Sequence, residues 1–294
     1  MRHILSYLLW PALLATCIAV TQLGIEVGQG FLVFNCAYLG LAASLFLLER
    51  RMPHERAWLE NCGQILPDLL HTLLSKSVVQ VILAVGTAMG FAEILVAEEG
   101  SSLWPSHWPF WAQVVLGLVI AEVGLYWAHR LAHEWPLLWR FHAIHHSATR
   151  LWFFNTGRFH LVDTAVSILM SQPLLLLAGA PKEEHIWFSA ITAFIGMLTH
   201  CNVEMRFGPL NYLFNTPWLH RWHHSMDIRE GNKNYGENLM IFDLLFGTWF
   251  NPPRRPPTDI GVKEPIPKSF LGQVAAPFRA APWRSANPLA TNDR

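Results

Sequence analysis

The chain has 294 residues, of which 52% are apolar and only 14% are charged, and its mean hydropathy is positive at +0.26. This composition excludes disordered and fibrous proteins and indicates a membrane protein. Lys plus Arg and Asp plus Glu both number 21, so no overall basic charge is available to bind nucleic acid. The four cysteines have no CxxC spacing, which argues against a disulfide framework and against a thiolate zinc site.

The N-terminal part of the chain contains two stretches without a charge, Ile4–Ile25 and Val27–Leu48. Each is long enough, at 1.5 Å per residue, to cross a hydrocarbon core of about 30 Å. We expect the N-terminus to be retained, because the first run is too long for a signal peptide and a second span follows at once. A third span is predicted at Ser77–Ala97 and a fourth at Leu103–Tyr126.

A last apolar pair, Thr164–Ala180 and Ile186–Val203, is joined by the short polar turn Pro181–Glu184. The pair forms either two spans or a re-entrant hairpin, and the sequence leaves both open. After Asn251 the chain is rich in Pro and Arg without apolar periodicity, which predicts an extended or partly disordered cytoplasmic tail over 251–294. Residues 1–100 are assigned to N-terminal transmembrane helices.

Positive charge predicts the orientation in the membrane, because loops rich in Lys and Arg stay in the cytoplasm. The acidic positions Glu26 and Glu98–Glu99 are expected outside. The cytoplasmic segments are then Arg2, Glu49–Arg56, Arg130–Arg158 and Arg221–Arg255. This assignment places all the histidine clusters on the cytoplasmic side, at helix ends.

Histidine is the residue type that carries chemistry, with 15 in the chain. Glu122, Tyr126, His129 and His133 are spaced by 4, 3 and 4, so they form one polar stripe on an otherwise apolar helix. Three further histidines, at i, i+3 and i+4, share a helix face, and the same spacing recurs downstream. These two clusters are His142, His145 and His146, and then His220, His223 and His224.

The number of clustered histidines predicts a dinuclear metal site. Imidazole binds zinc, iron, copper or nickel, and one ion takes roughly four to six ligands, so the eight histidines of the three clusters suit two ions. His200, near the end of an apolar segment, is predicted as a further ligand because ionisable groups at membrane depth are usually functional. His160 and Glu204 are additional candidates, whereas His54 and the other isolated histidines are expected to be structural.

The three clusters HRLAH (His129–His133), HAIHH (His142–His146) and HRWHH (His220–His224) resemble the histidine boxes of the fatty acid hydroxylase/sterol desaturase superfamily. The resemblance covers about Ala121 to Phe250, so residues 101–250 are assigned to a catalytic domain. It implies an all-α, multi-pass transmembrane bundle of about four spans plus the re-entrant or spanning pair, with a cytoplasmic helical cap that carries the metal site. Glu204 stands where fatty acid hydroxylases can show a further histidine.

The resemblance also implies the reaction. Its members are membrane-bound di-iron enzymes that use O2 and electrons from an external donor to hydroxylate or desaturate a C–H bond of a lipid. The box histidines would bind two irons, with their other ring nitrogens held by acceptors such as Asp163, Asp227 or Glu122. The short first box is similar to that of the sterol-modifying branch, which predicts a sterol-like or other isoprenoid lipid. The alternative is a hydroxylase of fatty acyl or alkyl lipids, and hydroxylation and desaturation both stay open.

The predicted partners follow from what the sequence lacks. No reductase or cytochrome b5-like segment is evident, so we expect a separate ferredoxin or cytochrome b5-type donor, with its reductase, at the cytoplasmic face. A bacterial inner membrane is favoured over the endoplasmic reticulum.

Two other classes of protein fit the histidines less well. A membrane metal transporter predicts ligands spread through the bilayer, whereas these gather at one side. A zinc hydrolase is excluded because the sequence after His133-Glu134 places Leu137 where HExxH needs histidine.

Overall fold

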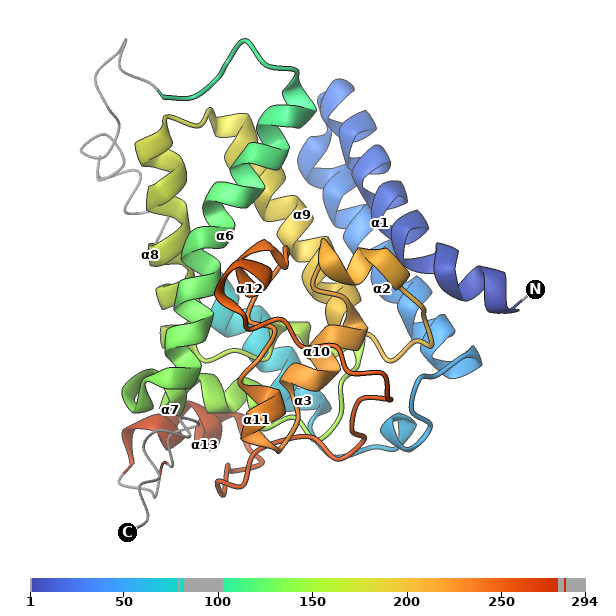
Figure 1. Ribbon diagram of the computed structural model, residues 1–294, viewed down its shortest axis with the longest axis vertical. Helices are drawn as coiled ribbons and strands as arrows, with labels where there is room; N and C mark the ends of the chain where they lie inside the picture. The colour runs from blue at the N-terminus through green and yellow to red at the C-terminus, as the bar shows by residue number, and fades with distance from the viewer. Residues whose placement is uncertain (1, 79, 82–102, 280–282, 284–294) are drawn as a thin grey trace.

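The computed structural model describes residues 2–78, 80–81, 103–279 and 283, and it is built from α-helices (Figure 1). Among these residues there is no β-strand, only isolated bridges such as that between Phe214 and Leu239. The predicted all-α class is therefore confirmed. The long helices are α1 (Arg2–Glu26), α2 (Gly30–Arg51), α6 (Phe110–Glu134), α8 (Leu161–Ala178) and α9 (Lys182–His200). The short ones are α3 (Ile65–Leu70), α7 (Pro136–His146), α10 (Pro217–His223), α11 (Ile228–Gly231), α12 (Ile241–Phe246) and α13 (Phe270–Ala275).

Four of the long helices, α1, α2, α6 and α8, are long and apolar enough to cross a membrane. Their outward side chains are apolar, as on α2, where Phe31 is 87% exposed, and lipid would cover this surface. The first two predicted spans match α1 and α2. The third predicted span, Ser77–Ala97, lies largely outside the described residues. The chain is thus a multi-pass membrane protein.

The fourth predicted span begins later than expected, at Phe110 rather than Leu103. Pro105 and Pro109 explain the difference, because a proline disfavours helical backbone in the residue before it. From Phe110 the helix continues without a break to Glu134. The first histidine box therefore lies on the last turns of a membrane-spanning helix.

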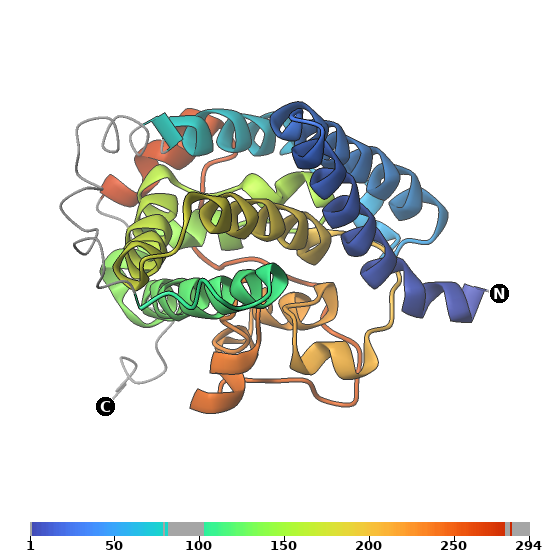
Figure 2. The same cartoon turned by 90° about the horizontal axis from the view of Figure 1, so that it is seen from above.

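The last apolar pair consists of helices α8 and α9, which differ in their surroundings. Gly179, with φ 76°, ends α8 in the left-handed conformation that favours glycine. Helix α9 begins at Lys182 and its side chains Phe194 and Leu198 are fully buried. It packs against α1, α2 and α6, and Figure 2 shows it between the α1–α2 pair and α6. Helix α9 is therefore the central helix of the bundle, and α8 is a candidate span.

Helices α6 and α8 approach each other closely at Gly124. A Cβ atom there would lie 2.0 Å from the backbone oxygen of Met170. Only glycine leaves room for this contact, which brings the first histidine box next to the start of α8.

The tail contains no helix over 251–269, but the short helix α13 that follows is ordered, which corrects the expectation for this segment alone. Helix α13 packs against α3, and its Gln273 side chain is fully buried. The Gln273 amide nitrogen donates to Gln64 Oε1 and to the Pro267 carbonyl, and its oxygen lies 3.0 Å from His71 Nε2. These polar anchors hold the segment without the apolar periodicity that sequence analysis looks for.

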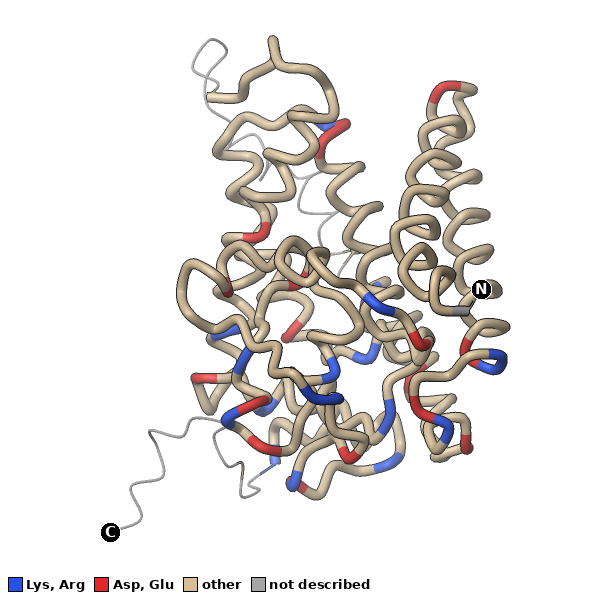
Figure 3. The backbone as a smooth tube through the Cα atoms, turned by 45° about the vertical axis from the view of Figure 1, so that its right-hand side comes forward, with Lys and Arg blue, Asp and Glu red and all other residues tan. Residues whose placement is uncertain are grey.

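Charged residues are distributed unevenly over the molecule. Figure 3 shows most of them at the end that holds the short helices, and few along the long helices. The histidines lie at this charged end, since they belong to the last turns of α6 and α9 and to the short helices α7 and α10.

Candidate metal centre

The nine histidines predicted as ligands come together in two buried groups. Within each group, one nitrogen from every ring lies within 4.8 Å of the others, so each group could hold a metal ion. The first group is His129, His133, His142, His146 and His223, and the second is His145, His200, His220 and His224.

Helical spacing explains how the two repeated boxes serve both groups. In α7, His142 and His146 are one turn apart and face the first group, while His145 faces the second. The box at α10 reverses this arrangement, because only its His223 belongs to the first group. Each box therefore links the two groups, which fixes their relative position.

The distances between ring nitrogens fit metal coordination. Neighbouring Nε2 atoms within each group are 3.0–3.1 Å apart. Two ligands at a right angle around an ion, with bonds of about 2.1 Å, are about 3.0 Å apart, whereas a tetrahedral angle would separate them by about 3.4 Å. The spacing thus favours a five- or six-coordinate ion over a tetrahedral one.

The hydrogen-bond partner of Nδ1 determines which ring nitrogen carries the proton in several of these histidines. In three cases Nδ1 faces a backbone carbonyl, which only accepts, so Nδ1 carries the hydrogen and Nε2 presents a lone pair to the group. Facing lone pairs at about 3 Å repel each other unless a cation lies between them, so this donor set fits metal ions. The carbonyls are Tyr235 for His129 (2.7 Å), Arg158 for His145 (3.2 Å) and Lys233 for His223 (2.8 Å).

Side-chain oxygens hold three further rings. The Nδ1 atom of His142 donates to Asp163 Oδ2 at 2.9 Å. Amide oxygens take the same role at 3.1 Å for the other two, which are His133 with Asn232 and His200 with Asn155. Sequence reasoning missed this role for both asparagines, because it looked for carboxylates as the partners of the rings and an amide is uncharged.

The other two carboxylates predicted to hold ligands lie elsewhere. Glu122 is fully buried and accepts hydrogen bonds from the backbone nitrogens of Glu237 and Asn238. Asp227 pairs with Arg229 at 2.7 Å at the surface. Glu122 therefore fixes the loop beside the site, and Asp227 caps α11.

Burial favours the neutral form of several of these histidines. It lowers the pKa of His200 to about 3, and burial together with the neighbouring imidazoles lowers the pKa of His145 and His223 well below the usual value. Neutral imidazole is the form that binds metal, so these rings need lose no proton at neutral pH.

His160 and Glu204 do not lie in either group. The His160 ring accepts from the Val162 backbone nitrogen at the start of α8, and its Nε2 donates to the Val274 carbonyl. Glu204 accepts a 2.7 Å hydrogen bond from His54 Nδ1. Both side chains are thus committed to structural contacts.

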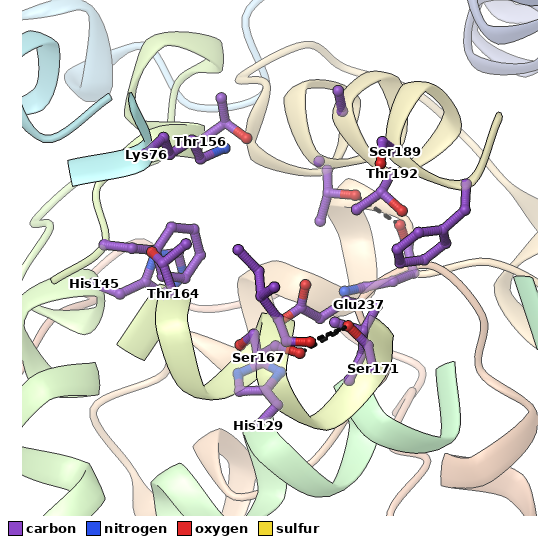
Figure 4. A pocket seen from close by; sticks show the side chains of 18 of the residues that line it. Lys76, His129, His145, Thr156, Thr164, Ser167, Ser171, Ser189, Thr192 and Glu237 are labelled. Atoms are coloured by element: carbon purple, nitrogen blue, oxygen red, sulfur yellow. Dashed lines mark hydrogen bonds between the residues drawn. The ribbon is translucent and has the colours of Figure 1, made fainter. Parts of the chain in front are cut away.

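Two cavities reach the histidines. The first, of about 320 Å³, touches His129, His145, His200 and His220, and Figure 4 shows hydroxyl side chains around it. The second, of about 900 Å³, touches His133, His146 and His223 and is rimmed by charged residues that include Arg229 and Lys263. Sequence reasoning missed Lys76 and Glu237, which also line the first cavity, because they lie far apart in the chain.

Comparisons with known proteins agree with this architecture. The fatty acid hydroxylase family model matches residues 114–248. The chain is 52% identical to an ornithine lipid hydroxylase of Rhizobium tropici, over 93% of this chain and 84% of that protein. It is also 33% identical to human alkylglycerol monooxygenase over 50% of this chain, a stretch that is 32% of the human enzyme. No solved structure matches the chain.

These relatives decide between the two predicted substrate classes. One is named an ornithine lipid hydroxylase and the other an alkylglycerol monooxygenase, and neither name mentions a sterol, which favours the predicted alternative over a sterol-like substrate. The short first box does not separate the two branches. The chain belongs to the fatty acid hydroxylase superfamily, and it is an integral-membrane oxygenase that hydroxylates lipids.

Proposed function

We propose that the protein is a di-iron, O2-dependent hydroxylase of a membrane lipid with an amino-acid headgroup, of which ornithine lipid is the model. The observation that carries this proposal is the pair of buried imidazole groups at the charged end of the membrane helices. The similarity to an ornithine lipid hydroxylase over nearly the whole chain supports the substrate class. It also favours hydroxylation over desaturation.

The residues present fit iron. The nitrogen spacing suits five or six ligands, and imidazole is a common ligand of iron. Iron in the two groups would supply the activation of O2 for insertion of one oxygen atom into a C–H bond. The chain itself orients the imidazoles through Asp163, Asn232 and Asn155, and burial in the helix bundle limits their contact with bulk water.

We propose that the site faces the cytoplasm, in a bacterial inner membrane. Basic residues gather at the end of the molecule that holds the site, and such segments stay inside. The relative from Rhizobium supports a bacterial membrane. A reporter fused after the C-terminus should be active only if it is cytoplasmic, and a periplasmic signal would contradict this orientation.

Electrons are proposed to come from a ferredoxin or cytochrome b5-type protein with its own reductase. The second cavity supports this, because it leads from charged residues at the surface to three histidines of the first group. Purified enzyme should be inactive alone and regain activity when such a donor is added. Sustained turnover without any donor would refute this part of the proposal.

The main test is metal content with one variant from each group. Wild-type protein from iron-replete cells should hold about two irons per chain, one for each group. The variants His145→Ala and His223→Ala should each lose iron, and the exposed His107→Ala should not. Lipid extracts should contain a product heavier by one oxygen atom. Protein without iron, or iron unaffected by both variants, would overturn the proposal.

A further inference from the structure

Two side chains of opposite charge, Lys76 and Glu237, line the first cavity. Both are partly buried. Within the described part of the chain, neither the Lys76 ammonium nor the Glu237 carboxylate forms a hydrogen bond or a direct ion pair, but the two charges attract each other at longer range. Because partly buried charges are normally in direct contact with a partner, two opposite charges in one cavity without such contact are unusual.

The other walls of the cavity are mainly apolar, but hydroxyl side chains lie among them. Figure 4 shows Lys76 and Glu237 on separate walls, with hydroxyl side chains between and around them. The hydroxyls of Thr164 and Thr192 are buried and have no hydrogen-bond partner among the described residues. Hydrocarbon placed against these polar groups would leave them unsatisfied, at a cost in free energy. The part of the cavity beside Lys76 and Glu237 therefore suits a polar, charged part of a ligand, and the apolar walls suit its hydrocarbon.

The pKa shifts of Glu237 and Lys76 indicate that both charged forms lack full stabilisation within the protein. Burial and the nearby Glu122 raise the pKa of Glu237 to about 8. Burial lowers the pKa of Lys76, and the attraction between Lys76 and Glu237 offsets only part of the two pKa shifts. Both shifts disfavour the charged forms, and a cation beside Glu237 with an anion beside Lys76 would offset them.

We infer that Lys76 and Glu237 form a headgroup site that binds a zwitterion, with the carboxylate at Lys76 and the ammonium at Glu237. The inference rests on the proposed function, for which it names specificity-determining residues. Ornithine has two amino groups and one carboxyl group, so acylation of one amino group leaves one ammonium and one carboxylate. Such a headgroup supplies both charges, and charge-assisted hydrogen bonds of this kind are strong.

The test measures binding rather than turnover. Full-length protein in detergent, without an electron donor, is titrated with short-chain ornithine lipid, its carboxyl methyl ester and its N-acetylated form. Wild type should bind each analogue about 10- to 100-fold more weakly than the parent lipid. This comparison needs no variant, so it holds even if a substitution disturbs folding. Equal affinity for all three ligands would overturn the inference.

Two variants assign each charge to its partner. Lys76→Gln should weaken binding of the parent lipid but not of the methyl ester, and Glu237→Gln should do the same for the N-acetylated form. The controls Lys182→Gln and Glu183→Gln remove the same charges from exposed positions and should bind as wild type does. Wild-type affinity in the Lys76 and Glu237 variants would contradict the site.

Two more measurements separate this inference from the function it rests on. Iron content should be unchanged in all four variants, so a loss of binding with iron retained concerns the headgroup alone. Phosphatidylethanolamine carries an ammonium and a phosphate, and it should bind more weakly than ornithine lipid. Equal binding of the two lipids would overturn the assignment of an amino-acid headgroup. The proposed di-iron hydroxylase would not be affected by that result, because the protein would still contain two irons.

Discussion

The buried ion pair between Arg158 and Asp68 allows a quantitative test of how the chain supports the metal centre. Arg158 Nη1 lies 2.7 Å from Asp68 Oδ1, and both side chains are 2% exposed. Arg158 also donates to the Ile144 carbonyl, and its own carbonyl accepts from the ring of His145. Asp68→Ala would therefore leave a guanidinium unpaired directly beneath the second histidine group.

The expected cost follows from burial. Removing one partner of a buried ion pair costs about 3–5 kcal/mol, since the other charge has lost its compensation. At roughly 2–4 °C per kcal/mol for a chain of this size, the unfolding midpoint should fall by about 6–20 °C. Burial raises the pKa of Asp68 even with Arg158 beside it, so desolvation outweighs the attraction. Replacing both partners, as in Asp68→Leu/Arg158→Met, should therefore cost less than the single change.

The assay is thermal unfolding in detergent, followed by tryptophan fluorescence at several heating rates, because membrane proteins often unfold irreversibly. Asp227→Asn serves as the control, since Arg229, its partner, is 82% exposed and surface pairs contribute little. This control should match wild type. An Asp68→Ala midpoint equal to that of the control would refute the argument from an unpaired buried charge.

Three further predictions concern the metal site, the packing and pH. Asp163→Asn should lower metal affinity about 10- to 100-fold in competition with a chelator, while Asp227→Asn should not, and equal affinities would contradict the role given to Asp163. Gly124→Ala places a Cβ 2.0 Å from the backbone of α8 and should cost about 1–3 kcal/mol in unfolding, whereas Gly117→Ala, with its nearest contact at 3.5 Å, should be tolerated. Burial lowers the pKa of His54 to about 4, below its unfolded value of about 6.5, so its contribution to stability is complete above pH 6.5 and is lost as pH falls toward 4. At pH 5 the loss is about 2 kcal/mol, so the midpoint of His54→Gln should fall less on acidification than that of wild type; an identical fall would show that His54 is not the group responsible.

The sequence by itself determines the parts of this protein that depend on local periodicity. Charge-free runs predicted α1 and α2, because a helix that crosses a bilayer must satisfy its backbone internally and present apolar side chains to lipid. Histidines at i, i+3 and i+4 share a helix face whatever the rest of the fold, so the box spacing predicted the metal-binding character of α7 and α10.

Only the tertiary structure decides what depends on contacts between distant segments. The box spacing did not say that His145 joins His200 and His220 rather than its neighbour His146. Nor could it show that the carbonyls of Tyr235 and other loop residues orient the rings, since every residue has a carbonyl. Helix α13 in the tail was missed because polar contacts of one glutamine, rather than an apolar stripe, hold it.

The first cavity shows most clearly which features depend on tertiary structure rather than on local sequence. Lys76 and Glu237 are ordinary charged residues in the sequence, more than a hundred positions apart, and no local pattern connects them. Folding places both on the walls of one cavity beside the histidines, where a partly buried charge without a direct partner favours a ligand of opposite charge. Local periodicity is set by the backbone of one helix, whereas a shared cavity is set by how the helices pack.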